Sequence, residues 1–300
     1  MPEPLILICD VGPRDGLQNE ERVLEPSVRA ELCHRLAAAG LRRVEAVSYV
    51  NPKLLPQMAD AEQVWAALPH GSRTVFTALV LNERGYDRAL AAGVREINYS
   101  FAVTDEFCRR NQNSTVEGCL ETLARLAARA REDSVRVVLT LSVCFGCPFE
   151  GRVDPSRVLE VVEAALRSEP AEVILADTIG VAVPTQVRDL VGAVAAMGVV
   201  TGGHFHNTRN TGYANALQAL DAGATVLDAS VGGAGGCPFA PRATGNIATE
   251  DLAYTLAGMG VPTGIDLNLL IETSHWLSAR LGKELPGMVA RAGPFEPVSG

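Results

Sequence analysis

Two histidines, His204 and His206, stand one residue apart in the segment GGHFHNTRN. The run VVTGG that leads into them is typical of a β-strand, in which alternate side chains point to the same face, roughly 7 Å apart. Two imidazoles placed in this way can bind one cation, each at about 2.1 Å from it. Two hydrogen-bonded core histidines would give the same spacing, so the pattern leaves a metal site and a packing role open.

Other side chains capable of chemistry follow the ends of other apolar runs. They are Asp10, Arg14, Asp15, Gln18 and Asn19 in the turn CDVGPRDGLQNE, Glu45 and Ser48 toward the end of the second run, Asp177 toward the end of the sixth, and Cys237 and Asn246 in the glycine-rich segment 232–246. A polar turn without function is the alternative interpretation of the first group. If the runs are strands of an α/β barrel, their carboxyl ends build the active site, and we expect these side chains to converge there.

Four of these residues form a possible ligand set: Asp15, His204, His206 and Asn246. The set mixes oxygen and nitrogen donors and contains no thiolate. Its oxygen share suits Mg²⁺ or Mn²⁺ better than a closed structural zinc site. We therefore predict a divalent metal, Mg²⁺ or Mn²⁺.

Three cysteines stand in segments that invite a functional interpretation. Cys237 lies in a loop with five glycines, which allow a close approach of backbone to ligand or a hinged lid. A small buried thiol is the ordinary alternative. Cys144 and Cys147 form a C-x-x-C pair that could be a redox pair or half of a zinc site, but no second pair accompanies it, so we favour a loop near the site.

Eight short apolar runs alternate with alanine- and leucine-rich helical patterns. We expect strands at 5–11, 42–50, 73–81, 96–103, 135–143, 171–180, 199–207 and 225–233, and helices at 25–40, 113–133 and 154–170. Near-continuous apolar runs suit parallel strands that are covered on both faces. Eight β–α units in one chain predict a TIM (β/α)8 barrel, with an open doubly wound sheet as the alternative.

The chain shows no linker rich in proline, serine or charge, so residues 1–300 are predicted to form a single barrel domain. The helical pattern LNLLIETSHWLSARLG follows the last strand. We expect residues 264–300 to pack on the barrel as a C-terminal extension.

Composition excludes several classes of partner. The 300 residues carry a formal net charge of −9, which argues against a nucleic-acid-binding surface. No apolar stretch approaches the roughly 18 residues of a membrane span, and the N-terminus lacks the features of a secretory signal. Seven scattered cysteines indicate reduced thiols. We expect a cytoplasmic protein without membrane or nucleic-acid partners, and a homo-oligomer of two or more subunits.

Several segments resemble the 3-hydroxy-3-methylglutaryl-CoA lyase family, in the same order along the chain. They are VGPRDGLQNE, SYVNPKLLPQMAD, CFGCPFEG, DTIGVAVP, HFH and GGCPFAPRATGNIATEDL. The resemblance implies a TIM barrel of the metal-dependent lyase and Claisen-synthase superfamily. It also implies an acyl-CoA substrate, cleaved to acetyl-CoA and acetoacetate.

The resemblance also assigns roles to individual residues. Metal ligands match Asp15, His204, His206 and Asn246, and active-site residues match Arg14, Glu45, Asp177 and Cys237. These roles suit a retro-aldol cleavage, which must deprotonate a tertiary hydroxyl and stabilise a thioester enolate. A divalent cation lowers the pKa of a bound hydroxyl, and Arg14 can donate to the enolate oxygen. We further predict that Gln18, Ser48 and Arg209 bind substrate.

One segment departs from the lyase pattern. Asn207 follows the histidine pair, as in the isopropylmalate and homocitrate synthases, and Arg209 follows closely. The VGPRDG start and the GGCP loop favour the lyase branch. A lyase for a related thioester such as citramalyl-CoA, a synthase that uses a 2-oxo acid, and a non-enzymatic metal-binding protein are the alternatives.

Overall fold

The structure, a computed structural model, describes residues 6–236 and 245–295 of the chain. Its strands are β1 (Leu7–Asp10), β2 (Arg43–Ser48), β3 (Val75–Val80), β4 (Glu96–Ala102), β5 (Arg136–Ser142), β6 (Glu172–Asp177), β7 (Val200–Phe205) and β8 (Val226–Ala229). Each strand pairs in parallel with its neighbours, and β8 pairs with β1, which closes the barrel. The predicted TIM barrel is therefore confirmed.

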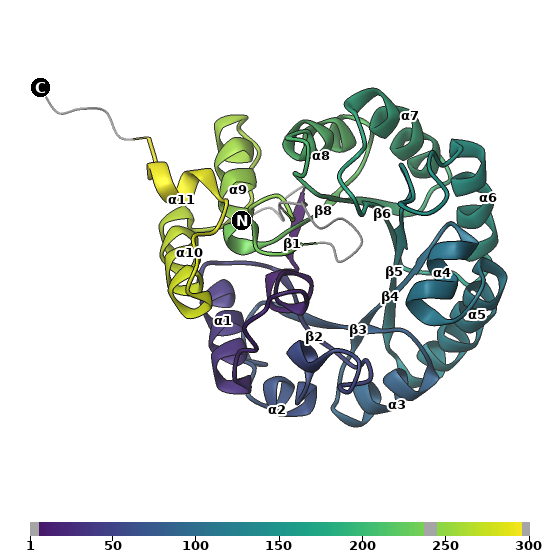
Figure 1. The fold of residues 1–300 in the computed structure, drawn as a ribbon, viewed down its shortest axis with the longest axis horizontal. Coiled ribbons are helices and arrows are strands. Elements are labelled where there is room, and N and C mark those ends of the chain that lie inside the picture. Colours follow the sequence, from purple (N-terminus) through teal and green to yellow (C-terminus); the bar gives the residue numbers. More distant parts are fainter. Residues whose placement is uncertain (1–5, 237–244, 296–300) are drawn as a thin grey trace, which may run out of the picture.

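Helices surround the barrel, as Figure 1 shows. They are α1 (Pro26–Ala38), α2 (Ala61–Ala66), α3 (Glu83–Ala91), α4 (Asp105–Gln112), α5 (Val116–Asp133), α6 (Pro155–Leu166), α7 (Pro184–Ala195), α8 (Gly212–Asp221), α9 (Thr249–Gly258), α10 (Leu267–Leu281) and α11 (Met288–Ala292). Among the described residues, no helix combines the length and the apolar character needed to cross a membrane.

Local sequence explains several helix ends. Asp154 caps α6 because its side chain accepts a hydrogen bond from the backbone N–H of Ser156, and Pro155 occupies the first helical position. Thr115 caps α5 in the same way, by accepting from Gly118. Aspartate and threonine are both residue types that favour the N-cap.

The C-terminal helices pack beside the first helix. α10 contacts α1 and α9, and α11 contacts α9 and α10 (Figure 1). Gly40, which follows α1 at φ +93°, lies so close to the Gly264 carbonyl that a Cβ there would come within 2.7 Å of its oxygen. The division of the chain into one barrel domain with residues 264–300 as an extension stays a prediction.

The strand predicted at 225–233 is shorter in the structure. β8 ends at Ala229, and a 3-10 turn, η3 (Val231–Gly233), follows. Gly232 and Gly233 have φ of 71° and 68°, a left-handed conformation that ends the extended backbone. The extended backbone of this strand therefore ends at Ala229, four residues before the predicted boundary.

Salt bridges fill the amino-terminal end of the barrel. Arg43, Glu96, Arg136 and Glu172 are the first residues of β2, β4, β5 and β6. Both arginines bond both glutamates, at N–O distances from 2.6 to 2.9 Å. Each buried carboxylate thus has two cationic partners, which is the condition for tolerating charge in a barrel core.

Candidate metal centre and active site

A short π-helical turn, η1 (Gly12–Gly16), carries Arg14 and Asp15 at the carboxyl end of β1. The Gly16 N–H donates to the Val11 carbonyl, five residues back, at 3.1 Å. The Asp10 carboxylate accepts from the Gly12 N–H at 2.8 Å and fixes the start of the turn. Such turns are rare and often occur at functional sites. Here the turn directs both side chains toward the barrel mouth.

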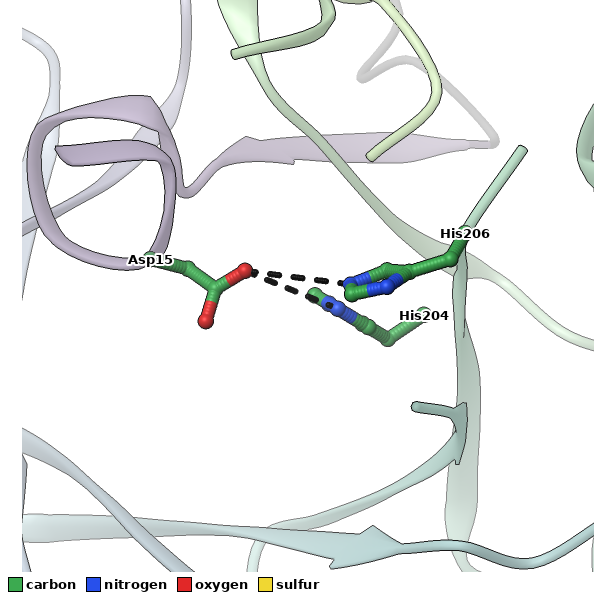
Figure 2. Close-up of side chains that lie close together, drawn as sticks. All are labelled: Asp15, His204 and His206. Atoms are coloured by element: carbon green, nitrogen blue, oxygen red, sulfur yellow. Dashed lines mark ion pairs between the residues drawn. The ribbon is translucent and has the colours of Figure 1, made fainter. Parts of the chain in front are cut away.

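Asp15 faces the two histidines of β7, as Figure 2 shows. Its Oδ2 lies 3.9 Å from His204 Nε2 and 4.0 Å from His206 Nε2, and the three ligand atoms lie within 4.8 Å of one another. These distances are too long for hydrogen bonds. They are close to twice a typical metal–ligand distance of about 2.1 Å. A cation between the three side chains fits this donor set, with the residue types that the sequence predicted.

His204 is oriented by a residue that the sequence analysis missed. Its Nδ1 lies 3.2 Å from Oδ2 of Asp228 on β8, which leaves Nε2 to face Asp15. Metal-binding histidines commonly donate their second ring N–H to a carboxylate in this way. The only sequence signal for Asp228 was an acidic residue inside the apolar run TVLDASV.

The charges of the three side chains also suit a cation. Burial raises the pKa of Asp15, but Arg14 and the two histidines outweigh it and lower the pKa to about 2. Burial lowers the pKa of His206 to about 4 and keeps this ring neutral. Burial also lowers the pKa of His204, but the bond to Asp228 and the charge of Asp15 reverse the shift and raise it. An anionic Asp15 and a neutral imidazole are the forms that bind metals.

Asn246 lies against the same carboxylate. Its Nδ2 donates to Asp15 Oδ2 at 2.9 Å and to the Ala234 carbonyl at 3.2 Å. Its backbone forms an isolated bridge with His206. The predicted ligand is therefore at the cluster, but its amide N–H and not its carbonyl faces Asp15. Asn246 as a metal ligand stays a prediction, because it requires the amide to turn over.

Arg14 is buried between two carboxylates. Its Nη1 bonds Asp15 Oδ1 at 2.7 Å, and its Nε bonds Oε2 of Glu45. A guanidinium has five N–H donors, so donors remain for a ligand in the cavity. Glu45, which the sequence placed among the catalytic residues, lies beneath Arg14 and does not line the cavity that Arg14 and Asp15 line.

That cavity has a volume of about 250 Å³. Its lining residues fall into three chemical groups. The charged and histidine side chains are Arg14, Asp15, His204, His206 and Asp228; the other polar residues are Gln18, Asn19, Ser100, Asn111, Thr140, Ser142 and Thr178. The apolar residues are Val50, Leu55, Leu79, Leu81, Phe107 and Ala176, and Gly236 completes the lining. Gln18 thus lies where the sequence predicted, with its Nε2 3.3 Å from Asp15 Oδ1.

Besides Glu45 and Asn246, three further predicted site residues lie outside this lining. Ser48 is fully buried at the end of β2, and its Oγ has no partner among the described residues. Asp177 accepts from the N–H groups of Val181 and Ala182, so it shapes the loop after β6. Arg209 donates to the Ile179 and Gly180 carbonyls and lines a second cavity of about 570 Å³ between α8, α9 and α11. Their functional roles stay predictions.

The cysteine predictions have different outcomes. Cys237 lies outside the described residues. Cys144 and Cys147 are buried, and their sulfurs contact the Leu141 carbonyl and the Thr104 hydroxyl, respectively. In the described ranges, the one cluster with metal-binding potential is that of Asp15 and the two histidines, so the C-x-x-C pair is part of no such group.

The HMGL-like family matches residues 5–277. The chain belongs to this family. It is 48% identical to the (R)-citramalyl-CoA lyase of Chloroflexus aurantiacus, over 97% of this chain and 96% of that protein. It is 39% identical to the mitochondrial hydroxymethylglutaryl-CoA lyase of Mus musculus, over 96% of this chain and 89% of that protein.

A solved relative shares the whole barrel. The HMG-CoA lyase from Acenitobacter baumannii, in complex with coenzyme A and 3-methylmalate, superposes with a TM-score of 0.93 at 35% identity and 98% coverage of both chains. These relatives are lyases, and the chain is accordingly a lyase of the HMG-CoA lyase type. The family is dependent on a divalent metal, and the Asp15 cluster is a possible site for it.

Proposed function

We propose that the protein is a divalent-metal-dependent lyase that cleaves a 3-hydroxy-3-methylacyl-CoA bearing a free carboxylate, and that citramalyl-CoA is its preferred substrate. The observation that carries the reaction type is the convergence of Asp15, His204 and His206 beside Arg14 in one cavity. The higher identity to the citramalyl-CoA lyase, 48% against 39%, favours the shorter acyl group.

3-Hydroxy-3-methylglutaryl-CoA, which the sequence motifs favour, is the second candidate. In both thioesters, the carbon that bears the tertiary hydroxyl is two bonds from the thioester carbonyl carbon. The glutaryl thioester has one additional methylene, between the hydroxyl-bearing carbon and the carboxylate. Cleavage of either breaks the same carbon–carbon bond and releases acetyl-CoA. The ketone product is pyruvate from citramalyl-CoA and acetoacetate from the glutaryl thioester, so one assay distinguishes them.

The metal ligands and Arg14 divide the work of the cleavage. Asp15, His204 and His206 would hold a divalent cation, Mg²⁺ or Mn²⁺, which lowers the pKa of the substrate hydroxyl when bound. Arg14 lines the same cavity and would donate to the thioester oxygen as enolate charge develops on it. Donors that gain strength in the transition state are typically worth about 3–4 kcal/mol each.

Proton transfers need two further groups. A base must take the hydroxyl proton, and an acid must protonate the enolate carbon of acetyl-CoA. We assign the second role to Cys237 and the first to Asp177, both on their sequence motifs. The apolar wall formed by Leu79, Leu81 and Phe107 supplies the surface for the acyl chain. A cytoplasmic location and a homo-oligomeric state also remain our proposals.

A direct assay tests this function. Purified protein, stripped of metal with a chelator and then supplied with Mg²⁺ or Mn²⁺, is incubated with each thioester, and acetyl-CoA, pyruvate and acetoacetate are measured. We expect metal-dependent release of acetyl-CoA and pyruvate, with at least a tenfold higher kcat/KM for citramalyl-CoA. A preference for the glutaryl thioester would assign the second candidate, and no cleavage of either would reject the proposal.

A further inference from the structure

A line of hydrogen bonds crosses the barrel interior beneath Arg14. Glu45 on β2 accepts from Asn98 Nδ2 on β4 at 2.9 Å, and Asn98 Oδ1 accepts from Thr140 Oγ1 on β5 at 3.0 Å. The exposed fractions of Glu45, Asn98 and Thr140 are 1%, 7% and 7%. Nothing in the sequence motifs pointed to Asn98 or Thr140.

The chemistry of the groups fixes the direction of every bond in this line. A carboxylate can only accept, so Asn98 must turn its NH2 group toward Glu45. The amide oxygen then faces Thr140, whose hydroxyl must donate to it. At the other end Arg14 can only donate to Glu45. The orientation of the Glu45 carboxylate therefore depends on two donors, one on each oxygen.

The two oxygens of Glu45 serve different partners. Oε2 binds Arg14, and Oε1 binds Asn98. Without the hydrogen bond from Asn98, the carboxylate could rotate about χ3, because the χ3 angles of glutamate have a broad distribution. Rotation would carry the Arg14 guanidinium with it, because Glu45 holds Arg14 from below while Asp15 holds it from the side. A displacement near 1 Å at a catalytic group can cost about a hundredfold in rate.

Asn98 itself does not reach the substrate. It lines a cavity of only about 20 Å³, together with Glu45, Thr140 and Asp228. Asn98 is absent from the lining of the cavity that contains Arg14 and Asp15, whereas Thr140 and Asp228 line both cavities. Asn98 can therefore affect catalysis only through its neighbours.

We propose that Asn98 is a positioning residue, which holds Glu45 in the orientation that aims Arg14 into the cavity and links that orientation to Thr140 on the cavity floor. The inference rests on the proposed lyase function, in which Arg14 acts on the developing enolate. It goes beyond that function because it assigns the alignment of Arg14 to strands β4 and β5, across the barrel from the metal ligands.

The main test replaces Asn98 with leucine, which has the same branching at Cγ and no hydrogen-bonding groups. We expect Asn98→Leu to lower kcat for thioester cleavage by about ten- to a hundredfold, with KM changed less than threefold. The dissociation constant for Mn²⁺ alone, measured by calorimetry, should stay within about twofold, because Asp15, His204 and His206 are not touched by Asn98.

A double-mutant cycle separates positioning from general destabilisation. In a Glu45→Gln background, where the anchor of Arg14 is already lost, Asn98→Leu should have little further effect on kcat. Thr140→Val, which removes only the outer hydrogen bond, should act in the same direction with a smaller loss. If Asn98→Leu fails to fold, Thr140→Val takes its place in the cycle.

Thr74→Val is the matched control. Thr74 is also buried and donates one hydrogen bond, to the Leu41 carbonyl at 2.7 Å, but at the opposite end of the barrel. It should lower the melting temperature and leave kcat unchanged. An equal kcat loss in Thr74→Val and Asn98→Leu, full additivity with Glu45→Gln, or a parallel loss of Mn²⁺ affinity would overturn the inference. Wild-type protein that cleaves neither thioester would instead reject the proposed function.

Discussion

The two ends of this barrel use charge in opposite ways. At the amino-terminal end, each of two arginines forms an ion pair with each of two glutamates, and their formal charges cancel. At the carboxyl-terminal end, Arg14 bonds two carboxylates, those of Asp15 and Glu45, and a third, that of Asp228, lies against His204. The histidine nitrogens there lie about 4 Å from Asp15, without a hydrogen bond.

The difference separates a structural network from a binding site. In a buried network where every carboxylate already has two cationic partners, the charges are compensated without a ligand. Removing one of the four side chains leaves an uncompensated charge. An excess of negative charge with open coordination distances is stabilised when a cation binds. The same residue types, arginine and carboxylate, thus hold the fold together at one end and form a reactive site at the other.

The largest effect should follow removal of a metal-binding imidazole. We expect His204→Ala and His206→Ala to abolish metal-dependent turnover and to weaken Mn²⁺ binding, measured by calorimetry, while circular dichroism shows a retained fold. His34→Ala is the control, because His34 bonds only the Ala67 carbonyl at the surface. Near-normal Mn²⁺ activation of both site variants would show that these histidines only pack together.

The two arginine networks can be compared directly by paired substitutions. Arg14→Gln should lower kcat about a thousandfold with Mn²⁺ still bound, because its donors act mainly in the transition state. Arg43→Gln should instead destabilise the fold by about 3–5 kcal/mol, because it leaves Glu96 and Glu172 with too little positive charge. Both variants are measured by denaturant unfolding and by steady-state kinetics. Similar losses of stability and of kcat in the two variants would contradict the assignment of Arg14 to catalysis and of Arg43 to folding.

A smaller effect is expected at the carboxylate behind the first histidine. Asp228→Asn should weaken Mn²⁺ affinity by about ten- to a hundredfold, because the bond to His204 Nδ1 loses its charge. Turnover at saturating Mn²⁺ should recover much of its wild-type value. Asp189→Asn, an exposed acid on α7, is the control. Unchanged Mn²⁺ affinity in Asp228→Asn would mean that the metal site does not depend on this contact.

The smallest effect concerns Glu250, a buried acid in the first turn of α9, which belongs to neither of the two charge networks. Burial raises its pKa to about 7, although its Oε2 accepts from the Gly232 N–H at 2.9 Å. The folded state therefore favours the protonated acid. This contribution to stability is fully present below about pH 4.5 and is lost as the pH rises through about 7.

Glutamine at position 250 mimics the neutral acid. Compared with wild type, Glu250→Gln should gain about 1–3 kcal/mol of relative stability between pH 5 and pH 8, measured by urea unfolding with a chelator present. A difference between the two proteins that does not vary with pH would show that Glu250 has an ordinary pKa. Glu272→Gln, at an exposed position on α10, is the matched control substitution.

The sequence by itself determined the features that depend on local pattern. The two-residue period of a strand placed His204 and His206 on one face, and the alternation of apolar runs with helical patterns predicted eight β–α units. The caps Asp154 and Thr115 likewise depend on local sequence, because a cap is a property of residue type and position. The motifs around Arg14 and Asp15 also indicated the family that the comparisons then showed.

Only the tertiary structure decided which distant residues meet. Asp228 reaches His204 because β8 pairs with β7, and Asn98 reaches Glu45 across the barrel interior, 53 positions away. The π-helical turn that directs Arg14 and Asp15, and the loop bonds of Asp177 and Arg209, depend on contacts that form when the barrel closes. No local periodicity encodes such pairings, because each is set by the register and curvature of strands that lie far apart in the sequence.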